Sequence, residues 1–488
     1  MLTGFMAWVI AIRWTIMWCT PNVFLTACLV LAGCALSGTQ NPDRPRSASP
    51  TPVHEVPIAI VTHLGADVDN VTVEQARELI DKGADNWSAL GGKSGPLHLT
   101  TAGVAEAGEA LRVSPSPLAA VSRVATEPGS VAIVPVTAVT PKVRVLTVDG
   151  VDPLRGAKDY PLSTTSSKRP GPVIVTTVVG DIMLGRRVGA LLERKGDPAA
   201  AFGPLADRLA SSDITVGNFE STLSRAGSPT QGGDSFASDP NVLDGLAEAG
   251  FDVISLGNNH LGDFGARAID ETIDRLLDEG FNITGGGKDL DQARAPAIIE
   301  RDGVRIGFIA TDSIGETPAA TDSRAGTNRV NAPPRTGPLD RQALDRVAAD
   351  IRQLDAEADI VVVLPHWGTQ YTHVPEDSQR EMARAFTDAG ADAVIGSHTH
   401  WVQGWEQMGD AAVIHSLGNF IFDMDFMRET QEGIFVEMVS WGDHIVAIEP
   451  VPYVIDAEFT PRMASPQRAE TIMEAIRGTS SPPYDKLR

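Results

Sequence analysis

Side chains that can ligate a metal or transfer a proton recur at the ends of apolar runs in the second half of this sequence. The chain has ten histidines, and six of them fall between His260 and His415. The segments in question are GDIM (180–183), GNFE (217–220), GNNHLGD (257–263), PHWG (365–368), GSHTH (396–400) and HSLGN (415–419). Ligands of α/β sheets bind at the carboxyl ends of the strands. The pattern therefore predicts the site of a metal-dependent hydrolase.

The candidate metal ligands are two carboxylates, one amide and three imidazoles: Asp181, Glu220, Asn259, His366, His398 and His400. Such a set suits Mn, Zn or Fe, and its oxygen content favours Mn. A carboxylate that bridges two ions about 4 Å apart would let them clamp the attacking and leaving oxygens. We therefore predict a divalent metal cofactor of one or two ions.

The individual ligands differ in how strongly the sequence supports them. His398 and His400 are two residues apart, so they share one face in an extended segment, and an irregular turn would also let both enter one pocket. His366 ends an apolar run (361–364), and a buried core histidine is the alternative. For Glu220 the alternative is a carboxylate that caps a helix.

His260 and Asp263 form the candidate catalytic pair. A histidine whose carboxylate partner lies three residues away is typical of an oriented general acid or base. The alternative for Asp263 is the N-cap of a helix that begins near Ala266, and the two roles are compatible.

These side chains need a sheet to position them. Predicted strands cover residues 173–179, 213–216, 252–256, 305–310, 360–364, 393–395 and 412–415, and a hairpin follows over 434–439 and 445–450. Predicted helices between them cover 205–210, 241–249, 266–279, 340–354 and 378–389. The strands are almost continuously apolar, as strands covered on both faces are. The alternation predicts an α/β domain over residues 173–460.

A smaller α/β unit is predicted over residues 55–165, followed by a linker (166–172). Its segment TVEQARELIDKGADNWSALGG, in which Thr72 is the expected helix N-cap, resembles the PstS-like periplasmic phosphate-binding proteins. The resemblance covers one lobe of such a protein, and a scaffold without a ligand is the alternative. Residues 461–488 are predicted to be a C-terminal tail, loose after Arg477.

The N-terminus predicts a lipoprotein. All three cysteines lie within the first 34 residues, and residues 23–33 form a short apolar stretch that suits a signal peptide. LAGC, ending at Cys34, resembles the bacterial lipobox, in which the cysteine is lipidated. We expect a signal peptide (1–34), a disordered Pro-rich tether (35–54) and a location on the outer face of the bacterial cell membrane. The alternatives are an uncleaved anchor helix and a translation start at Met17.

The net charge of -23 argues against nucleic acid or an anionic lipid surface as a partner. An acidic surface that serves solubility alone is the simpler interpretation of this charge. The oligomeric state is left open by the sequence.

Six segments together resemble the bacterial capsule-synthesis CapA family, of the poly-γ-glutamate type, within the calcineurin-like metallophosphoesterases. They are VVGDIMLGRRV, VGNFESTLSRAGSP, the stretch from LAEAGFDVISLGNNHLGD to NITGGG, LPHWGTQY, VIGSHTHWVQGWE and VIHSLGNFIFD. The resemblance covers residues 173–451 and implies a four-layer αββα sandwich. It also implies ligand roles: Asp181 and His400 on one ion, Asn259, His366 and His398 on the other, Glu220 as the bridge, and His260 as acid/base.

Two positions depart from the superfamily pattern. The first motif of the superfamily reads Asp-x-His, whereas this chain has Met183 at the third position. Glu220 stands where the superfamily usually has Asp. Because a thioether is a poor ligand for a hard metal site, a single-metal enzyme is an alternative to the two-metal site.

The sequence thus favours an envelope-anchored hydrolase of phosphoester or amide bonds, acting through a metal-activated water in capsule or surface-polymer metabolism. The alternative is a non-catalytic scaffold or assembly factor with a structural metal site and a docking or phosphate-sensing N-terminal lobe. Arg186, Arg225 and Trp367 flank the ligands and are predicted substrate contacts. Ordinary surface charges and core packing are their respective alternatives.

Overall fold

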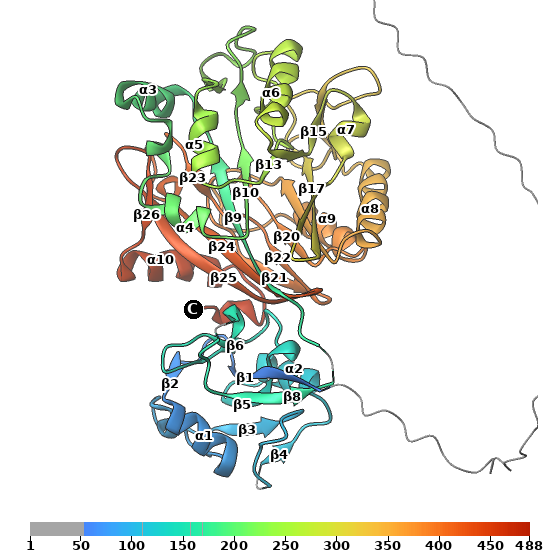
Figure 1. The fold of residues 1–488 in the computed structure, drawn as a ribbon. Helices are drawn as coiled ribbons and strands as arrows, with labels where there is room; N and C mark the ends of the chain where they lie inside the picture. The colour runs from blue at the N-terminus through green and yellow to red at the C-terminus, as the bar shows by residue number, and fades with distance from the viewer. Residues whose placement is uncertain (1–52, 110, 157, 168) are drawn as a thin grey trace, which may run out of the picture. The chain divides into compact units, whose positions relative to one another are not determined.

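The computed structural model describes residues 53–488 except 110, 157 and 168, and this part of the chain has the predicted α/β class (Figure 1). The predicted signal peptide, its Cys34 and the tether up to residue 52 lie outside the described residues. Among the residues that are described, no helix combines the length and apolar character needed to cross a membrane.

The N-terminal part is built on one mixed sheet. Its strands run in the order β4 (Arg112–Val113), β3 (His98–Thr101), β5 (Ser130–Pro135), β1 (His54–Thr62) and β6 (Arg144–Val145), and β8 (Ser163–Ser166) also pairs with β1. Helices α1 (Val73–Lys82) and α2 (Pro117–Thr126) and the small pair β2 (Asn70–Val71) and β7 (Thr147–Val148) complete it. Thr72 caps α1 as predicted, in a reciprocal capping box with Gln75.

The larger part contains two sheets. The first runs β14 (Asn282–Thr284), β13 (Val253–Ser255), β10 (Ile214–Phe219), β9 (Val173–Ile182), β24 (Glu432–Trp441), β25 (His444–Ile455) and β26 (Pro461–Met463), with β23 (Asn419–Ile421) also on β9. The second runs β16 (Ala297–Arg301), β17 (Val304–Asp312), β19 (Ile360–His366), β20 (Ala393–Ile395), β22 (Ala411–Ile414) and β21 (Trp405–Met408). Strands β9, β10, β13 and β14 are parallel, and so are β17, β19, β20 and β22.

Helices and short strand pairs connect these sheets. The helices are α3 (Arg186–Lys195), α4 (Ala206–Ala210), α5 (Val242–Glu248), α6 (Ala266–Asp278), α7 (Leu290–Arg294), α8 (Arg341–Asp355), α9 (Asp377–Thr387) and α10 (Pro466–Arg477). The strand pairs are β11 (Thr222–Leu223) with β12 (Ala237–Ser238), and β15 (Gly286–Gly287) with β18 (Gly326–Thr327). The predicted strands and the helices of residues 173–460 all occur, with ends shifted by one to three residues at most positions. Helices α3, α7 and α10 were not predicted.

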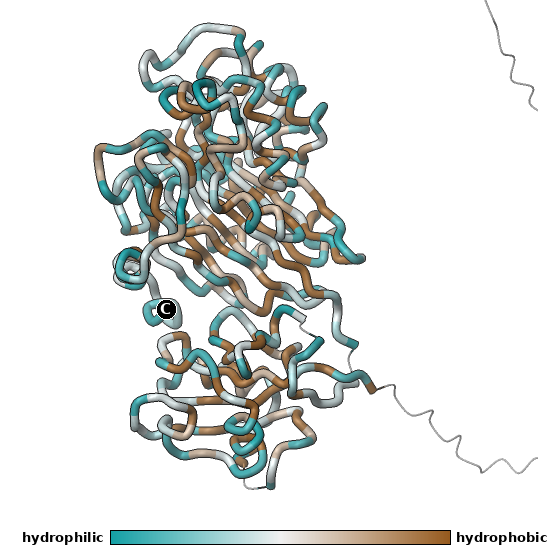
Figure 2. Tube along the Cα trace, turned by 60° about the vertical axis from the view of Figure 1, so that its left-hand side comes forward, coloured by the Kyte–Doolittle hydropathy of each residue, from teal (hydrophilic) through white to brown (hydrophobic). Residues whose placement is uncertain are grey.

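Apolar side chains of the larger part form three clusters. One contains inward-facing residues of both sheets, such as Val216 of β10 and Val362 of β19. A second lies between the first sheet and helices α3, α5 and α6, and a third between the second sheet and helices α8 and α9. Figure 2 shows the corresponding hydrophobic colouring along the strands. This burial on both faces explains why the strands read as continuous apolar runs.

The chain after Pro461 is ordered, contrary to the prediction of a loose end. Helix α10 buries Ile472 and Ile476 in the cluster between the sheets. Tyr484 is 1% exposed, its ring lies 5.5 Å from that of Trp405, and its hydroxyl donates to Gln407 Oε1 at 2.9 Å. The Gly, Ser and Pro residues that suggested a loose end therefore form a turn that places the ring of Tyr484 in the core.

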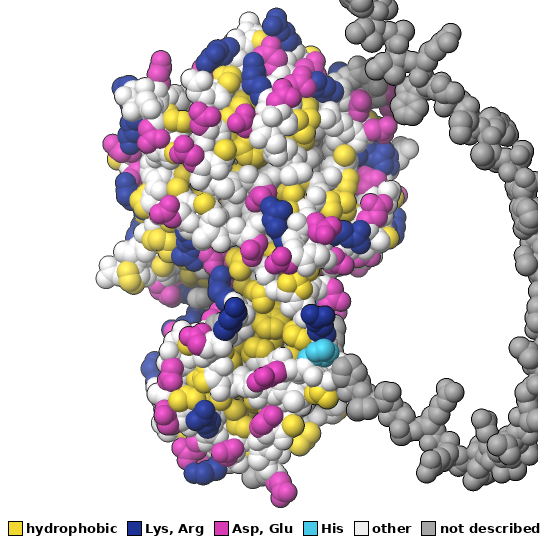
Figure 3. All heavy atoms as spheres, in the orientation of Figure 1, with side chains coloured by type: hydrophobic (Ala, Val, Ile, Leu, Met, Phe, Trp, Pro, Cys, Tyr) yellow, Lys and Arg dark blue, Asp and Glu magenta, His cyan; other side chains and the backbone are white. Residues whose placement is uncertain are grey.

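On the face shown in Figure 3, acidic and basic side chains are interspersed. Among the described residues many charged side chains form exposed ion pairs, such as Lys82 with Glu78 and Arg225 with Asp239. Exposed pairs of this kind contribute little to stability, about 0 to 1 kcal/mol each. On that face the carboxylates do not form a single acidic block.

Candidate metal centre

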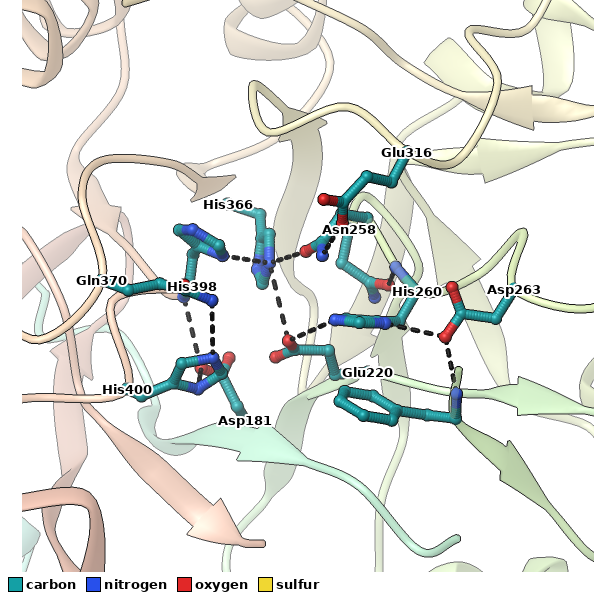
Figure 4. Close-up of polar contacts among 12 residues, drawn as sticks. Asp181, Glu220, Asn258, His260, Asp263, Glu316, His366, Gln370, His398 and His400 are labelled. Atoms are coloured by element: carbon teal, nitrogen blue, oxygen red, sulfur yellow. Dashed lines mark hydrogen bonds and ion pairs between the residues drawn. The ribbon is translucent and has the colours of Figure 1, made fainter. Parts of the chain in front are cut away.

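The two sheets bring the predicted ligands together at the carboxyl ends of their parallel strands (Figure 4). Asp181 lies near the end of β9, Glu220 follows β10, Asn259 follows β13, His366 ends β19, and His398 and His400 follow β20. All six ligands are at most 2% exposed. The pairing register places Asn218 of β10 opposite Asp181, and His366 opposite Asp312 of β17.

Asp181, Glu220 and His400 form the first group whose ligand atoms lie within 4.8 Å of one another. The Nδ1 atom of His400 lies 2.8 Å from Oδ1 of Asn419, whose own amide nitrogen donates to Thr430 O. Because that oxygen only accepts, Nδ1 of His400 carries the hydrogen and its Nε2 keeps a lone pair. Such an outer partner is typical of a metal-ligating histidine.

Glu220, His366 and His398 form the second group, so Glu220 belongs to both. Nε2 of His366 lies 3.2 Å from Nδ1 of His398 and 2.9 Å from Oδ1 of Asn259. The other nitrogen of His366, Nδ1, contacts Ser397 Oγ at 2.8 Å. Nε2 of His366, Nδ1 of His398 and Oδ1 of Asn259 thus converge next to the carboxylate of Glu220. A cation would stabilise this arrangement of lone pairs.

The buried atoms of this cluster that lack hydrogen bonds, and its two adjacent carboxylates, fit a metal site. Oε1 of Glu220 and Nε2 of His398 are buried and have no hydrogen-bond partner among the described residues. Burial and the charge of Asp181 raise the pKa of Glu220 well above its usual range. Burial also raises the pKa of Asp181, to about 6. Two adjacent buried carboxylates are costly to ionise without a compensating cation. The residues present therefore fit one or two divalent ions.

Burial has the opposite effect on the histidines of the cluster. It lowers the pKa of His366 and of His398 well below the usual range, and that of His400 to about 4. Nearby histidines lower the pKa further. The rings are therefore neutral near pH 7, which is the form that ligates metals.

His398 and His400 both have left-handed backbone conformations, with φ of 91° and 58°. Left-handed φ is uncommon for residues other than glycine, and it persists where surrounding contacts hold it. The backbone N–H of His398 donates to Oδ2 of Asp181, which helps to fix this turn. The irregular turn anticipated from the GSHTH spacing is present, and it directs both imidazoles into one cluster.

His260 lies beside this cluster and is held by Asp263. Nδ1 of His260 is 2.7 Å from Oδ2 of Asp263, and Nε2 is 3.7 Å from Oε1 of Glu220. Asp263 also accepts from the backbone N–H of Phe236 at 2.6 Å. Helix α6 begins at Ala266 after an N-cap Gly265 without a side-chain cap. The alternative role of Asp263 as a helix cap is therefore wrong.

Phe236 fixes the plane of the His260 ring. The two rings are stacked with centroids 3.8 Å apart and an interplanar angle of 22°. The guanidinium of Arg186 lies 4.8 Å from the centroid of Phe236 and is paired with Asp423. Arg186, one of the predicted substrate contacts, is thus linked to the candidate acid/base through an aromatic ring.

The other two predicted substrate contacts are not part of the cluster. Trp367 is 1% exposed, lies in the apolar cluster with α8 and α9, and donates from Nε1 to His415 O. This corrects its prediction as a substrate contact: the residue after His366 points to the opposite face of the strand. The side chain of Arg225 is 65% exposed and pairs with Asp239 instead of any predicted ligand.

Met183 is fully buried in the cluster that α3 covers, and its sulfur accepts from Gly185 N–H at 3.1 Å. It therefore packs as a core residue. The side chain that contacts the first ligand group is Asn218 of β10. Its Nδ2 donates to Asp181 Oδ1 at 2.8 Å and lies 3.4 Å from Glu220 Oε2.

Several residues around the site were not predicted: Asn218, Phe236, Asn258, Glu316, Ser397 and Asn419. Asn218 and Asn419 stand in the motifs GNFE and HSLGN, where the signal in the sequence is an amide side chain at the end of a strand. Asn258 accepts from the backbone N–H of His260 and donates to Asn218 Oδ1. Phe236 and Glu316 stand in no motif, so only the fold reveals them.

The chain is similar to several known proteins. The family model "Bacterial capsule synthesis protein PGA_cap" matches residues 175–424, half of the chain. The capsule biosynthesis protein CapA of Bacillus anthracis is 29% identical over 289 residues, which cover 58% of this chain and 68% of that protein. The PGA biosynthesis protein CapA of Bacillus subtilis is 30% identical over 269 residues, 54% and 67% of the two chains. A probable polyglutamine synthesis accessory protein of Mycobacterium tuberculosis is 26% identical, with 52% and 76% covered.

Solved structures give weaker similarities. A hypothetical protein from Thermus thermophilus is 18% identical, with a TM-score of 0.37 over 58% of this chain and 99% of that chain. An ABC-type phosphate transport receptor from Vibrio cholerae is 19% identical, with a TM-score of 0.20 over 24% and 59%. At these TM-scores neither structure defines the fold. The family match and the curated relatives show that the chain belongs to the bacterial capsule synthesis protein family PGA_cap, whose members include the CapA proteins.

Proposed function

We propose that this protein is a metal-dependent hydrolase, anchored at the cell envelope, that acts on capsule or surface polymer of the poly-γ-glutamate type. The observation that carries the proposal is the pair of ligand groups that share Glu220 next to the His260–Asp263 pair. A purely structural metal site requires closed coordination and no acid/base residue. Here an oriented histidine faces the shared carboxylate at 3.7 Å.

In this proposal Asp181 and His400 would hold one ion, and Asn259, His366 and His398 would hold the other. Glu220, which belongs to both groups, would contribute to both. Divalent ions at these positions supply Lewis-acid chemistry: they lower the pKa of water and polarise a scissile phosphoester or amide.

The residues of the chain supply the proton transfer. Asp263 keeps the hydrogen of His260 on Nδ1, so Nε2 is the atom that exchanges a proton with the leaving group. The stack of Phe236 on the imidazole holds that nitrogen toward Glu220.

We further propose that residues 173–460 form a four-layer αββα sandwich of the metallophosphoesterase type. The apolar cluster between the two sheets and the outer clusters beneath α3, α5, α6, α8 and α9 support this assignment. For residues 55–165 we propose a single lobe of the PstS-like kind, with a scaffold role as the alternative.

A second candidate is a non-catalytic assembly factor with a structural metal site. The name of the Mycobacterium tuberculosis relative, an accessory protein of polyglutamine synthesis, favours it. The two candidates differ in what they require of His260, because an assembly factor has no use for a group that transfers protons.

The test combines metal analysis with hydrolysis assays. Purified wild type is dialysed, its metal content is measured, and it is assayed with Mn or Zn on phosphomonoesters, phosphodiesters and γ-glutamyl amides. We expect two ions per chain and hydrolysis of at least one substrate class. His260→Ala should keep the metal and lose about 10²- to 10⁴-fold in kcat. His98→Ala, at an exposed position in β3, is the control. Equal activity of wild type and His260→Ala on every substrate would leave the assembly factor as the function.

The cellular location is part of the proposal. We propose that Cys34 is lipidated and tethers the protein to the outer face of the bacterial cell membrane. Cys34→Ala should move the protein from the membrane fraction to the soluble fraction, with Cys28→Ala as the control. Retention of the Cys34→Ala variant in membranes would refute the lipid anchor.

A further inference from the structure

The amide of Asn259 has a second partner besides its histidine. Its Nδ2 donates to Oε2 of Glu316 at 2.8 Å, while its Oδ1 lies 2.9 Å from Nε2 of His366. An amide offers one acceptor end and one donor end. Because Glu316 accepts from the donor end, the oxygen is left facing the histidines, and oxygen is the end that a hard divalent ion binds.

Glu316 is itself held in place. Its Oε1 accepts from Arg335 at 2.7 Å, so one carboxylate oxygen binds the asparagine and the other binds the arginine. The backbone of Glu316 has a left-handed φ of 71°. Such a conformation in a residue other than glycine persists only where the surroundings impose it, and it recurs at functional sites.

The loop that carries Glu316 starts from a buried anchor. Asp312 at the end of β17 is fully buried, and it accepts from the backbone N–H of Ile314, from Thr327 Oγ1 and from Arg329. The register of β17 and β19 places Asp312 opposite His366. The loop therefore leaves the sheet beside His366 and brings Glu316 to Asn259, another candidate ligand.

We propose that Glu316 is a positioning residue that fixes the carbonyl oxygen of Asn259 toward the metal ion, with Arg335 as its counter-charge. The inference rests on the proposed metal site and adds a residue that acts through a ligand. Without Glu316 the amide loses the partner that distinguishes its two ends. It would then present its NH₂ group to the ion for part of the time, and the ion would bind more weakly.

The test measures metal binding directly, by isothermal titration of dialysed protein with Mn²⁺. Glu316→Ala should weaken one of the two ions by about 10- to 100-fold. Glu316→Gln keeps an acceptor oxygen for the asparagine, so it should recover most of this loss. Asp322→Ala, at an exposed position on the same connection, is the matched control and should bind as wild type does.

A double substitution separates positioning from general damage. In an Asn259→Ala background, Glu316→Ala should change Mn²⁺ affinity by less than about two-fold, because the residue on which it acts is gone. An equal loss in both backgrounds, or wild-type affinity in Glu316→Ala, would overturn the inference. Failure of Glu316→Gln to recover affinity would also overturn it. If wild type binds no Mn²⁺ or Zn²⁺, it is the proposed metal site that fails.

Discussion

Nδ1 of His260 lies 2.7 Å from Oδ2 of Asp263. The same carboxylate accepts from the backbone N–H of Phe236 and from Gln231 Nε2, so its oxygens already have fixed donors. A carboxylate in this environment holds an imidazole in one tautomer and one orientation. In the proposed hydrolase, Nε2 is therefore the nitrogen that would exchange a proton, and it lies on the side of Glu220.

Asp263→Asn should remove that tautomer preference and leave the shape of the site intact. An amide that turns its NH₂ toward Nδ1 stabilises the wrong tautomer, with the hydrogen on Nε2. We expect kcat to fall by about 10²- to 10⁴-fold while both ions remain bound. The measurements are kcat on the substrate class that wild type hydrolyses, and metal content. Asp239→Asn, at a carboxylate that pairs with exposed Arg225, is the control. Unchanged kcat in Asp263→Asn would contradict an acid/base role for His260.

Met183 provides a prediction about metal stoichiometry. Because its side chain is fully buried and packs in the core, Met183→Leu should bind as many ions as wild type and cost less than about 1.5 kcal/mol of stability. Met183→Ala should cost about 2 to 5 kcal/mol through the cavity that it leaves. Metal analysis and urea unfolding measure the two effects. Loss of one ion in Met183→Leu would show that the sulfur is a ligand.

The convergence of the six candidate ligands could be predicted from the sequence because each of them stands at or just after the end of an apolar strand. Each strand carries its polar residue to the carboxyl end of the parallel strands in one of the two sheets. Asp181 of the first sheet and His366 of the second therefore meet although they are far apart in the chain. The helices between strands could be predicted for a similar reason: one apolar face and a glycine after the last turn, as at Gly250 and Gly390.

Other parts of the site depend on contacts that sequence spacing does not encode. Phe236 directly precedes β12, whose pairing with β11 places the ring against His260. Glu316 contacts Asn259 from a loop in which Glu316 itself has a left-handed backbone. For Trp367 the alternative of core packing holds, because adjacent residues of a strand point to opposite faces and His366 faces the site. The C-terminal segment was predicted to be loose from its Gly, Ser and Pro content, and the burial of Tyr484 outweighs that local signal.

Asp392 predicts a pH dependence of stability that is independent of the metal site. Burial, with a further contribution from Asp355, raises its pKa from 3.8 to about 6, and its carboxylate accepts from Val361 N–H. A raised pKa in the folded state means that folding favours the protonated form. This contribution is therefore fully present below about pH 4 and is lost as the pH rises toward 6. The loss is about 2 to 3 kcal/mol at 1.36 kcal/mol per pKa unit.

Asp392→Asn keeps an acceptor for Val361 and removes the ionisation. Relative to wild type, its free energy of unfolding should increase between about pH 4 and 6 and then stay constant. Urea unfolding at several pH values, with chelator present throughout, measures this difference, and Asp388→Asn at an exposed position is the control. A constant difference between Asp392→Asn and wild type across this range would contradict the prediction.

The packing of Tyr484 on Trp405 predicts that the last eleven residues stabilise the larger part of the chain. Tyr484→Ala removes a ring that is 1% exposed and a hydroxyl that donates to Gln407. Loss of a buried aromatic side chain costs about 3 to 5 kcal/mol. Thermal unfolding should show a lower Tm for Tyr484→Ala, whereas Met463→Ala, at a residue that is 48% exposed, should stay within about 0.5 kcal/mol of wild type. Because the ring is buried outside the ligand cluster, metal content of the folded variant should be unchanged. An unaltered Tm would show that the C-terminal segment does not hold its position on Trp405 in solution.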